Sequence, residues 1–201
     1  ETRLDIDEAG IRADLATRAV RVVLPVRTSA PGPVAARLAV ELLAASDEVI
    51  GGGARDVTLE PGAGPLAVVA SARQLEWDVR DLHVTRLRYR VEAGAARAEG
   101  IVAFGPLVHE AFELVAVASE SPRAGAPYPV AVLARRVGGG APAASVQVDA
   151  KLVLDRGDEE MSLTRSARTD GSGIATFDFD LPAGAEVGGA EVEVTGRRGG
   201  F

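Results

Sequence analysis

The segment from Thr169 to Pro182 constrains the fold of this chain most strongly, because a turn sequence leads directly into strict alternation of apolar and polar residues. The turn reads Thr-Asp-Gly-Ser-Gly, and Asp, Ser and Gly are the residues that tight turns favour. Side chains alternate between the two faces of a β-strand. We therefore expect a turn and then a strand that buries Phe177, Phe179 and Leu181 and exposes Thr176, Asp178 and Asp180.

The same pattern of short alternating runs and turns recurs along the whole chain. In the first half the runs cover residues 20–26, 37–42, 57–59, 66–70, 86–91 and 101–108. In the second half they cover residues 113–119, 129–137, 145–154, 161–168, 174–181 and 190–195. The one helical candidate, residues 12–21, competes with the alternation that starts at Val20. Strands separated by short turns, without long amphipathic helices between them, predict an all-β fold of two tandem antiparallel β-sandwich domains, similar to immunoglobulin domains.

We place the domains at residues 1–108 and 112–201, joined by a short stiff segment at 108–111 that contains neither Gly nor Pro. The alternation also predicts the residues of the two cores, because every second residue of a strand lies on the same face. A shift of one residue in a strand would turn its apolar residues toward solvent. The first core consists of Val20, Val22, Leu24, Leu38, Val40, Leu87, Tyr89 and Val91; the second consists of Val146, Val148, Leu152, Phe177, Phe179 and Val192. Arg21, Glu41 and Gln147 should then lie outside.

Three local features complete the expected architecture. Pro25 cannot donate a ladder hydrogen bond, which predicts an edge strand or a bulge there. The glycine triplets at 51–53 and 138–140 are expected to be flexible connections. A sandwich of about seven strands would need one more strand after the six that follow Phe112. This count predicts a second domain truncated at its C-terminal strand, with an unpaired edge near Val192 and Val194.

Composition excludes several classes of function. The net charge is −7, and the basic residues, all Arg except one Lys, are scattered, so nucleic acid is not an expected partner. No Cys is present, which excludes a disulfide framework and a thiolate metal site. No apolar run reaches ~18 residues, so no membrane-spanning segment is expected. The chain opens at Glu1 without Met, which indicates a removed signal peptide or a cut fragment.

Few residues carry recognisable catalytic chemistry. His83 and His109 would have to converge with a carboxylate to bind zinc, and they belong to different segments. Asp155, Asp158, Glu159 and Glu160 do not have the spacing of an EF-hand and are interpreted as a solvated hairpin tip. A Gly-x-Ser-x-Gly elbow is absent. Asp178 and Asp180 could mimic a glycosidase pair, although alternation alone places them on one face. We therefore predict no catalytic, cofactor or metal site.

Two features could serve in binding. Arg86, Arg88 and Arg90 share one strand face, either as partners of acidic residues such as Glu41 on a neighbouring strand or as a docking strip for an acidic partner. Trp77, the only Trp, is interpreted as a packing residue; a sugar-stacking role is the alternative.

Three stretches of the second half carry a resemblance to a known family. They are residues 119–130, Gly140-Ala141-Pro142, and the segment from Arg168 to Phe177. Most strongly over residues 112–182, the chain resembles the macroglobulin domains of the alpha-2-macroglobulin family, particularly its bacterial members. Ser119 and Ser121 stand where that family usually has Asp and Tyr ahead of the Pro/Gly turn. The family's thioester lies in a Cys-Gly-Glu-Gln motif that this chain lacks, so the resemblance implies a scaffold piece.

The expected function is therefore that of non-enzymatic structural or interaction modules. They would belong to a larger extracellular or periplasmic protein of macroglobulin type that traps proteases. The partners would be other domains of the same polypeptide or another protein, and the sequence leaves the oligomeric state open. The alternatives are an adhesin or carbohydrate-binding module and an accessory domain of a secreted hydrolase.

Overall fold

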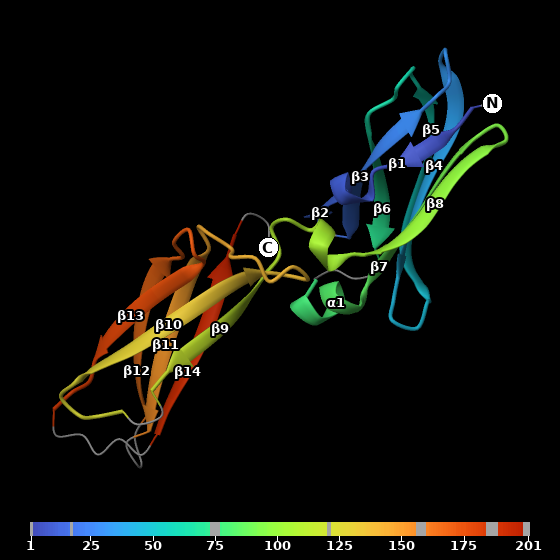
Figure 1. Cartoon of the computed structure of the whole chain (residues 1–201). Coiled ribbons are helices and arrows are strands. Elements are labelled where there is room, and N and C mark those ends of the chain that lie inside the picture. The colour runs from blue at the N-terminus through green and yellow to red at the C-terminus, as the bar shows by residue number, and fades with distance from the viewer. Residues whose placement is uncertain are drawn as a thin grey trace. The chain divides into compact units, whose positions relative to one another are not determined.

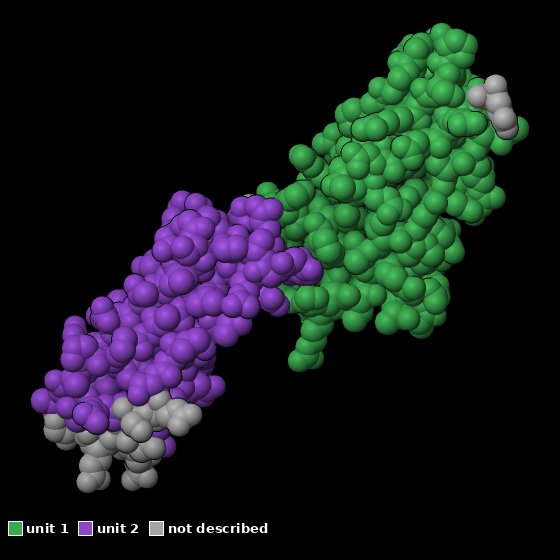
Figure 2. Space-filling model, in the orientation of Figure 1, with its two compact units in different colours: residues 1–111 green, residues 112–201 purple. Residues whose placement is uncertain are grey.

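The computed structural model describes residues 2–16, 18–72, 77–119, 122–155, 160–183 and 189–198. Antiparallel strands dominate these residues and form sandwich-like layers, which confirms the all-β class (Figure 1). The chain divides into two compact units, residues 1–111 and residues 112–201 (Figure 2). The division falls at the end of the segment in which the sequence places the domain boundary. Each unit is described separately below.

Unit 1 is built on a single folded sheet. Its elements are β1 (Leu4–Ile6), η1 (Glu8–Gly10), β2 (Arg12–Ala16), β3 (Ala19–Thr28), β4 (Val34–Leu43), β5 (Val49–Leu59), β6 (Pro65–Ala72), α1 (Val79–Val84), β7 (Arg86–Ala93), β8 (Ala96–Ala103) and η2 (Gly105–Leu107). The strand order is β1-β3-β6-β5-β4-β7-β8, and β2 also pairs with β3. Only Gly51↔Ala72 and Gly52↔Ser71 join β5 to β6. The sheet folds at this narrow link, because β4 also contacts β6, and β1 contacts β8 at the other end.

The core of unit 1 follows the parity of the sequence. All eight residues predicted for it are buried, and Arg21 is exposed. Glu41 is partly buried on the outer side of β4, where an arginine pairs with it. The buried face predicted for these strands is therefore confirmed.

Of the two alternatives predicted for Pro25, the edge strand is wrong, because β3 lies inside the sheet. It pairs with β6 on one side and with β2 and then β1 on the other. The partner changes at this point: β2 ends its pairing at Val23, and β1 begins at Val26. Pro25, which has no N–H to donate, lies in the gap, and its carbonyl accepts a bond from the Asp7 N–H at 3.1 Å. A proline is tolerated inside this sheet because the ladder is interrupted there.

The glycine triplet at 51–53 is not a connection but part of the continuous strand β5. A Cβ added at Gly53 would lie 2.1 Å from the Val69 carbonyl oxygen, and one at Gly51 would lie 2.4 Å from that of Ser71. Glycine is therefore required for the close approach of β6 to β5. The second triplet does lie in a turn, with positive φ angles at Gly138 and Gly140.

Two further local predictions are corrected in unit 1, and one helix is new. Residues 12–16 and 19–21 belong to the paired strands β2 and β3 and not to a helix, and Arg18 has a positive φ. The strand expected over 101–108 is β8, which ends at Ala103 and is followed by η2. The six-residue helix α1 was not predicted; Asp78 caps it, accepting from the Asp81 N–H at 2.8 Å, and Leu82 is its buried residue.

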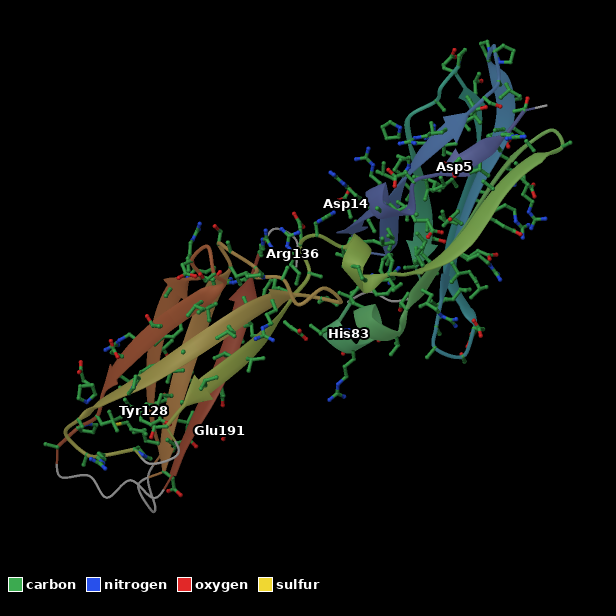
Figure 3. All side chains as sticks on the ribbon, in the orientation of Figure 1. Asp5, Asp14, His83, Tyr128, Arg136 and Glu191 are labelled. Atoms are coloured by element: carbon green, nitrogen blue, oxygen red, sulfur yellow. The ribbon has the colours of Figure 1, made fainter. Side chains whose placement is uncertain are left out.

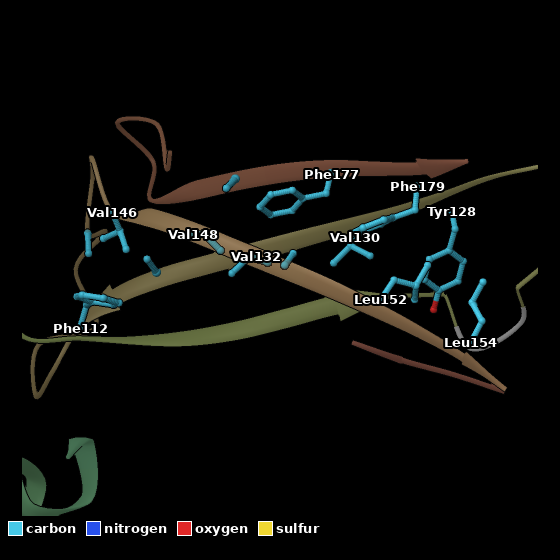
Figure 4. Packing of buried hydrophobic residues seen from close by; sticks show 14 of the residues in the cluster. Phe112, Tyr128, Val130, Val132, Val146, Val148, Leu152, Leu154, Phe177 and Phe179 are labelled. Carbon is cyan, nitrogen blue, oxygen red and sulfur yellow. The ribbon is translucent and has the colours of Figure 1, made fainter. Parts of the chain in front are cut away.

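Unit 2 is a sandwich of two three-stranded sheets. Its strands are β9 (Phe112–Ala118), β10 (Pro127–Arg136), β11 (Gln147–Asp155), β12 (Glu160–Arg168), β13 (Ile174–Asp180) and β14 (Gly189–Arg197). One sheet has the order β13-β10-β9 and the other β12-β11-β14. The inward residues of both sheets interdigitate in one core (Figure 4).

The predicted core of unit 2 is confirmed except at its rim. Val146, Val148, Leu152, Phe177 and Phe179 are buried, whereas Val192 is partly buried and packs against them from β14. Gln147 remains on the outer side of β11. Strand β14 pairs with β11, and within the described residues no second strand pairs with it.

Candidate functional site

The arginine strip lies on the outer face of β7 in unit 1. Glu41 is directly across from Arg88 in the β4–β7 ladder, and Glu99 is across from Arg90 in the β7–β8 ladder. Arg88 Nε donates to Glu41 Oε2 at 2.5 Å, and Arg90 Nε donates to Glu99 Oε2 at 3.2 Å. Arg86 Nη2 reaches Asp47 Oδ1 at 2.5 Å. The expected cross-strand partner Glu41 is thus confirmed, and every arginine of the strip has a carboxylate partner.

Two more side chains extend this ion-pair network. Arg97 pairs with Glu99, and both Arg90 and Arg97 have a nitrogen 3.9 Å from Glu92 Oε1. The bond from Arg97, aided by Arg90, lowers the pKa of Glu99 below its ordinary value. The side chains of these pairs are 37% to 72% exposed, so each pair contributes little to stability. The compensated charge favours a structural interpretation of the strip over docking of an acidic partner.

A charged groove that the sequence did not indicate lies beside this network. It has a volume of about 910 Å³. Its lining includes Asp5 of β1, Asp7 between β1 and η1, Glu8 of η1 and Glu99 of β8. Tyr89 closes its base: the buried Oη donates to Glu8 Oε1 at 2.5 Å. Burial, reinforced by Glu8, raises the pKa of Tyr89 above its usual range. A Cβ at Gly100, opposite Tyr89 in β8, would lie 2.4 Å from Oη, so glycine there makes room for the bond.

Trp77 has a packing role within unit 1. Its ring centroid lies 5.3 Å from that of Phe104, with the planes tilted by 47°. Phe104 is fully buried, and Trp77 is partly buried. This tilted contact is typical of aromatic packing and confirms the packing interpretation.

The residues considered for metal binding do not form a cluster. His83 is exposed on α1 (Figure 3), and His109 is exposed between η2 and β9. Asp155 and Glu160 face each other at the ends of β11 and β12; Asp158 and Glu159 lie outside the described residues. Within the part of the chain that the structure describes, no three His, Cys, Asp or Glu side chains are placed to hold a metal ion.

The Thr-Asp-Gly-Ser-Gly segment joins the two sheets of unit 2. Buried Thr169 donates to the Ala143 carbonyl at 2.7 Å and accepts from the Val146 N–H at 3.0 Å. Asp170 Oδ1 accepts from the N–H groups of Ser172 and Ile174 at 2.8 and 3.0 Å. Gly173 has φ +74°, and a Cβ there would lie 2.5 Å from the Ala134 carbonyl oxygen. These contacts explain each residue of the motif by turn chemistry.

Asp178 and Asp180 point outward from β13, as alternation predicts. They are exposed, with Phe177, Phe179 and Leu181 buried beside them, and Thr176 is exposed as well. The alternation of the sequence therefore explains why Asp178 and Asp180 share one face of β13.

An apolar surface, also not indicated by the sequence, covers the outer face of β9 and of the neighbouring part of β10. Val115 and Val117 of β9 are 48% and 57% exposed. Leu133 lies opposite Val115 and Ala131 opposite Val117 in the β9–β10 ladder, and both are partly exposed. A shallow groove of about 390 Å³ runs between Val117, Pro129 and Thr176 over Ala131. The outer face of the other sheet is polar, with pairs between Asp149 and Ser166 and between Lys151 and Glu193.

Comparisons with known proteins identify no family for this chain. No family model matches it, and no curated protein matches it. Among solved structures, a calcium-binding mutant of Bacteroides uniformis beta-glucuronidase 2 matches 51% of this chain and 14% of its own, with 11% identity and a TM-score of 0.35. A beta-glucuronidase from glycoside hydrolase family 2 matches 57% of this chain and 11% of its own, with 7% identity and a TM-score of 0.32. This chain thus spans a small fraction of either protein.

None of the helices in the described residues has the length and apolar character needed to cross a bilayer.

Proposed function

We propose that this chain supplies two non-enzymatic β-sandwich modules that serve as structural or interaction parts of a larger extracellular or periplasmic protein. One observation carries the proposal: the polar side chains that the sequence singled out hold strands and turns together. Arg86, Arg88 and Arg90 are paired with carboxylates. Thr169 bonds the backbone of the connection that leads into β11, and Asp170 bonds the backbone of its own turn. Groups engaged in this way are poorly placed to act as nucleophiles or bases.

A protease-trapping protein of macroglobulin type is the class of parent protein we favour. The resemblance of residues 112–182 to macroglobulin domains supports this choice, and the absence of Cys from the chain assigns the thioester to another part of such a protein. These modules would then be scaffold and would neither cleave nor inhibit a protease by themselves.

The test is an incubation of the purified chain with serine, cysteine and metalloproteases at a molar excess of the chain. We expect unchanged cleavage of both a small peptide and a large protein substrate, since covalent trapping requires a thioester. Stoichiometric inhibition of any protease would contradict the proposal.

A glycan panel addresses the two alternative functions. If the chain bound a glycan and Trp77→Ala abolished this binding, a carbohydrate-binding module would be favoured instead. Cleavage of a glycoside would favour an enzyme. A Val91→Ala variant, altered in the core of unit 1 to which Trp77 belongs, serves as the control for general destabilisation.

A further inference from the structure

Strand β9 differs from the other edge strands of unit 2 in having no charge along its central residues. The two sheets have four edge strands: β9, β13, β12 and β14. Strand β13 exposes Asp178 and Asp180, β14 exposes Glu191 (Figure 3) and Glu193, and β12 exposes Arg165 and Arg168. Residues 114–118 of β9 read Leu-Val-Ala-Val-Ala. Charged side chains are a common means by which proteins keep strand edges from pairing, and β9 lacks them.

The outer face of β9 is accessible to an added strand, whereas its inner face packs at the rim of the core and contacts β14 of the other sheet. On the outer face, Val115 and Val117 are about half exposed. On the inner face, Leu114, Ala116 and Ala118 are only partly buried and pack at the rim of the core. Within the described residues, β10 is the only strand that pairs with β9. A strand added at this edge would gain ladder hydrogen bonds and would cover apolar side chains on both faces.

We propose that this edge is an interface between two copies of the chain, in which β9 pairs antiparallel with β9 of the partner subunit. A strand that pairs with this edge should be apolar on both faces, as β9 is. The β9 strand of a second copy of the chain meets this requirement. Pairing centred on Ala116 places Val115 opposite Val117 of the partner subunit and Leu114 opposite Ala118 of the partner subunit. The valine pairs are β-branched neighbours of the kind that stabilise sheets.

Charge is compatible with the same register. Glu113, the one charged residue of β9, comes opposite Ser119 of the partner subunit, so no two carboxylates meet. The two-fold operation then joins the β13-β10-β9 sheets of both copies into one continuous sheet. This interface does not depend on the proposed scaffold function.

The size of the contact predicts a weak dimer. A seven-residue strand is about 24 Å long. Edge-to-edge pairing over that length buries less than the ~1,600 Å² of a standard stable interface, so we expect a dissociation constant roughly in the micromolar range or above.

Sedimentation equilibrium of the full chain over a wide concentration range is the first test. We expect a monomer–dimer equilibrium that Val117→Lys, or independently Val115→Lys, abolishes, since a charge would enter the pairing edge. Thr164→Lys on β12, an exposed edge position of the other sheet, should leave the dimer intact. Thermal melting of each variant shows that it remains folded.

Cross-linking tests the register, because the chain has no native Cys. In the proposed pairing residue 116 faces its own counterpart, at a Cα separation of about 4.5 to 5.5 Å that a disulfide can span. Ala116→Cys should form a disulfide dimer under mild oxidation, and Thr164→Cys should not. A chain that stays monomeric at all concentrations, a dimer that both lysine variants leave unchanged, or equal cross-linking of the two cysteine variants would overturn the proposal.

Discussion

At the scale of single residues, Tyr89 shows how a buried polar group connects distant parts of unit 1. Its hydroxyl donates to Glu8, which lies 81 positions earlier in the chain. Glu8 is exposed, so its carboxylate could be hydrated if the hydroxyl were removed. The bond therefore contributes its own modest stability and leaves no buried charge behind when it is lost.

We expect Tyr89→Phe to lower the free energy of unfolding of unit 1 by about 1 kcal/mol at neutral pH. The variant should also resist alkaline pH better. The pKa of Tyr89 is raised in the folded state, so its contribution is complete below the unfolded pKa of about 10 and is lost as the pH rises through the folded value. Phe cannot ionise and escapes that loss.

Urea unfolding followed by the fluorescence of Trp77, which lies in unit 1, measures both effects at pH 7 and above pH 10. Tyr128→Phe is the matched control: burial also raises the pKa of Tyr128, but this residue belongs to unit 2. An equal alkaline loss in the parent chain and in Tyr89→Phe would contradict the assignment.

At the scale of elements, the sheet of unit 1 depends on how closely β6 approaches β5. The ladder between them contains only two residue pairs, and Gly51 and Gly53 lie against the backbone of β6. Ser71 Oγ adds a bond to the Gly52 carbonyl at 3.2 Å. The fold of the sheet thus depends on the absence of side chains at this link.

We expect Gly53→Ala to destabilise unit 1 by about 1 to 3 kcal/mol, because the new methyl group would overlap the Val69 carbonyl and force the strands apart. Gly32→Ala is the control in the same unit: a Cβ there meets nothing within 4 Å. Urea unfolding of the two variants gives the comparison. Equal stabilities would show that β6 can move away from β5 at no cost.

At the scale of the whole molecule, each unit has its own buried core and its own sheets. The core of unit 2 is drawn entirely from residues of β9 to β14 and their connections. The strand pairing of unit 1 is likewise complete within residues 1–111. Each unit therefore meets the requirement for folding alone, which is a hydrophobic core of its own.

We expect residues 1–111 and residues 112–201, produced as separate polypeptides, each to give a β-type circular dichroism spectrum and one cooperative thermal transition. Cooperative unfolding is the relevant measure, since a collapsed but unpacked chain would lack it. Failure of either polypeptide to show a transition would mean that its core needs the other unit.

The sequence by itself determined which side of each strand faces a core. Alternation is a local property: in the segment after Thr169, Phe177 and Phe179 are buried and Asp178 is exposed simply because successive side chains point to opposite faces. The turn at residues 169–173 was equally predictable, because Asp and Gly have local conformational reasons to be there.

Only the tertiary structure decided which strands are neighbours. The same alternation in β3 is compatible with an edge or an interior position, and the partners that make it interior come from β1, β2 and β6. The prediction that residues 51–53 are a flexible connection was wrong for the same reason, because the backbone that excludes a side chain there belongs to β6. The charged groove at Tyr89 and the apolar face of β9 likewise arise from segments brought together by pairing. The face on which a side chain lies depends on that residue and its neighbours in the sequence. The choice of neighbouring strand depends on segments far apart in the chain.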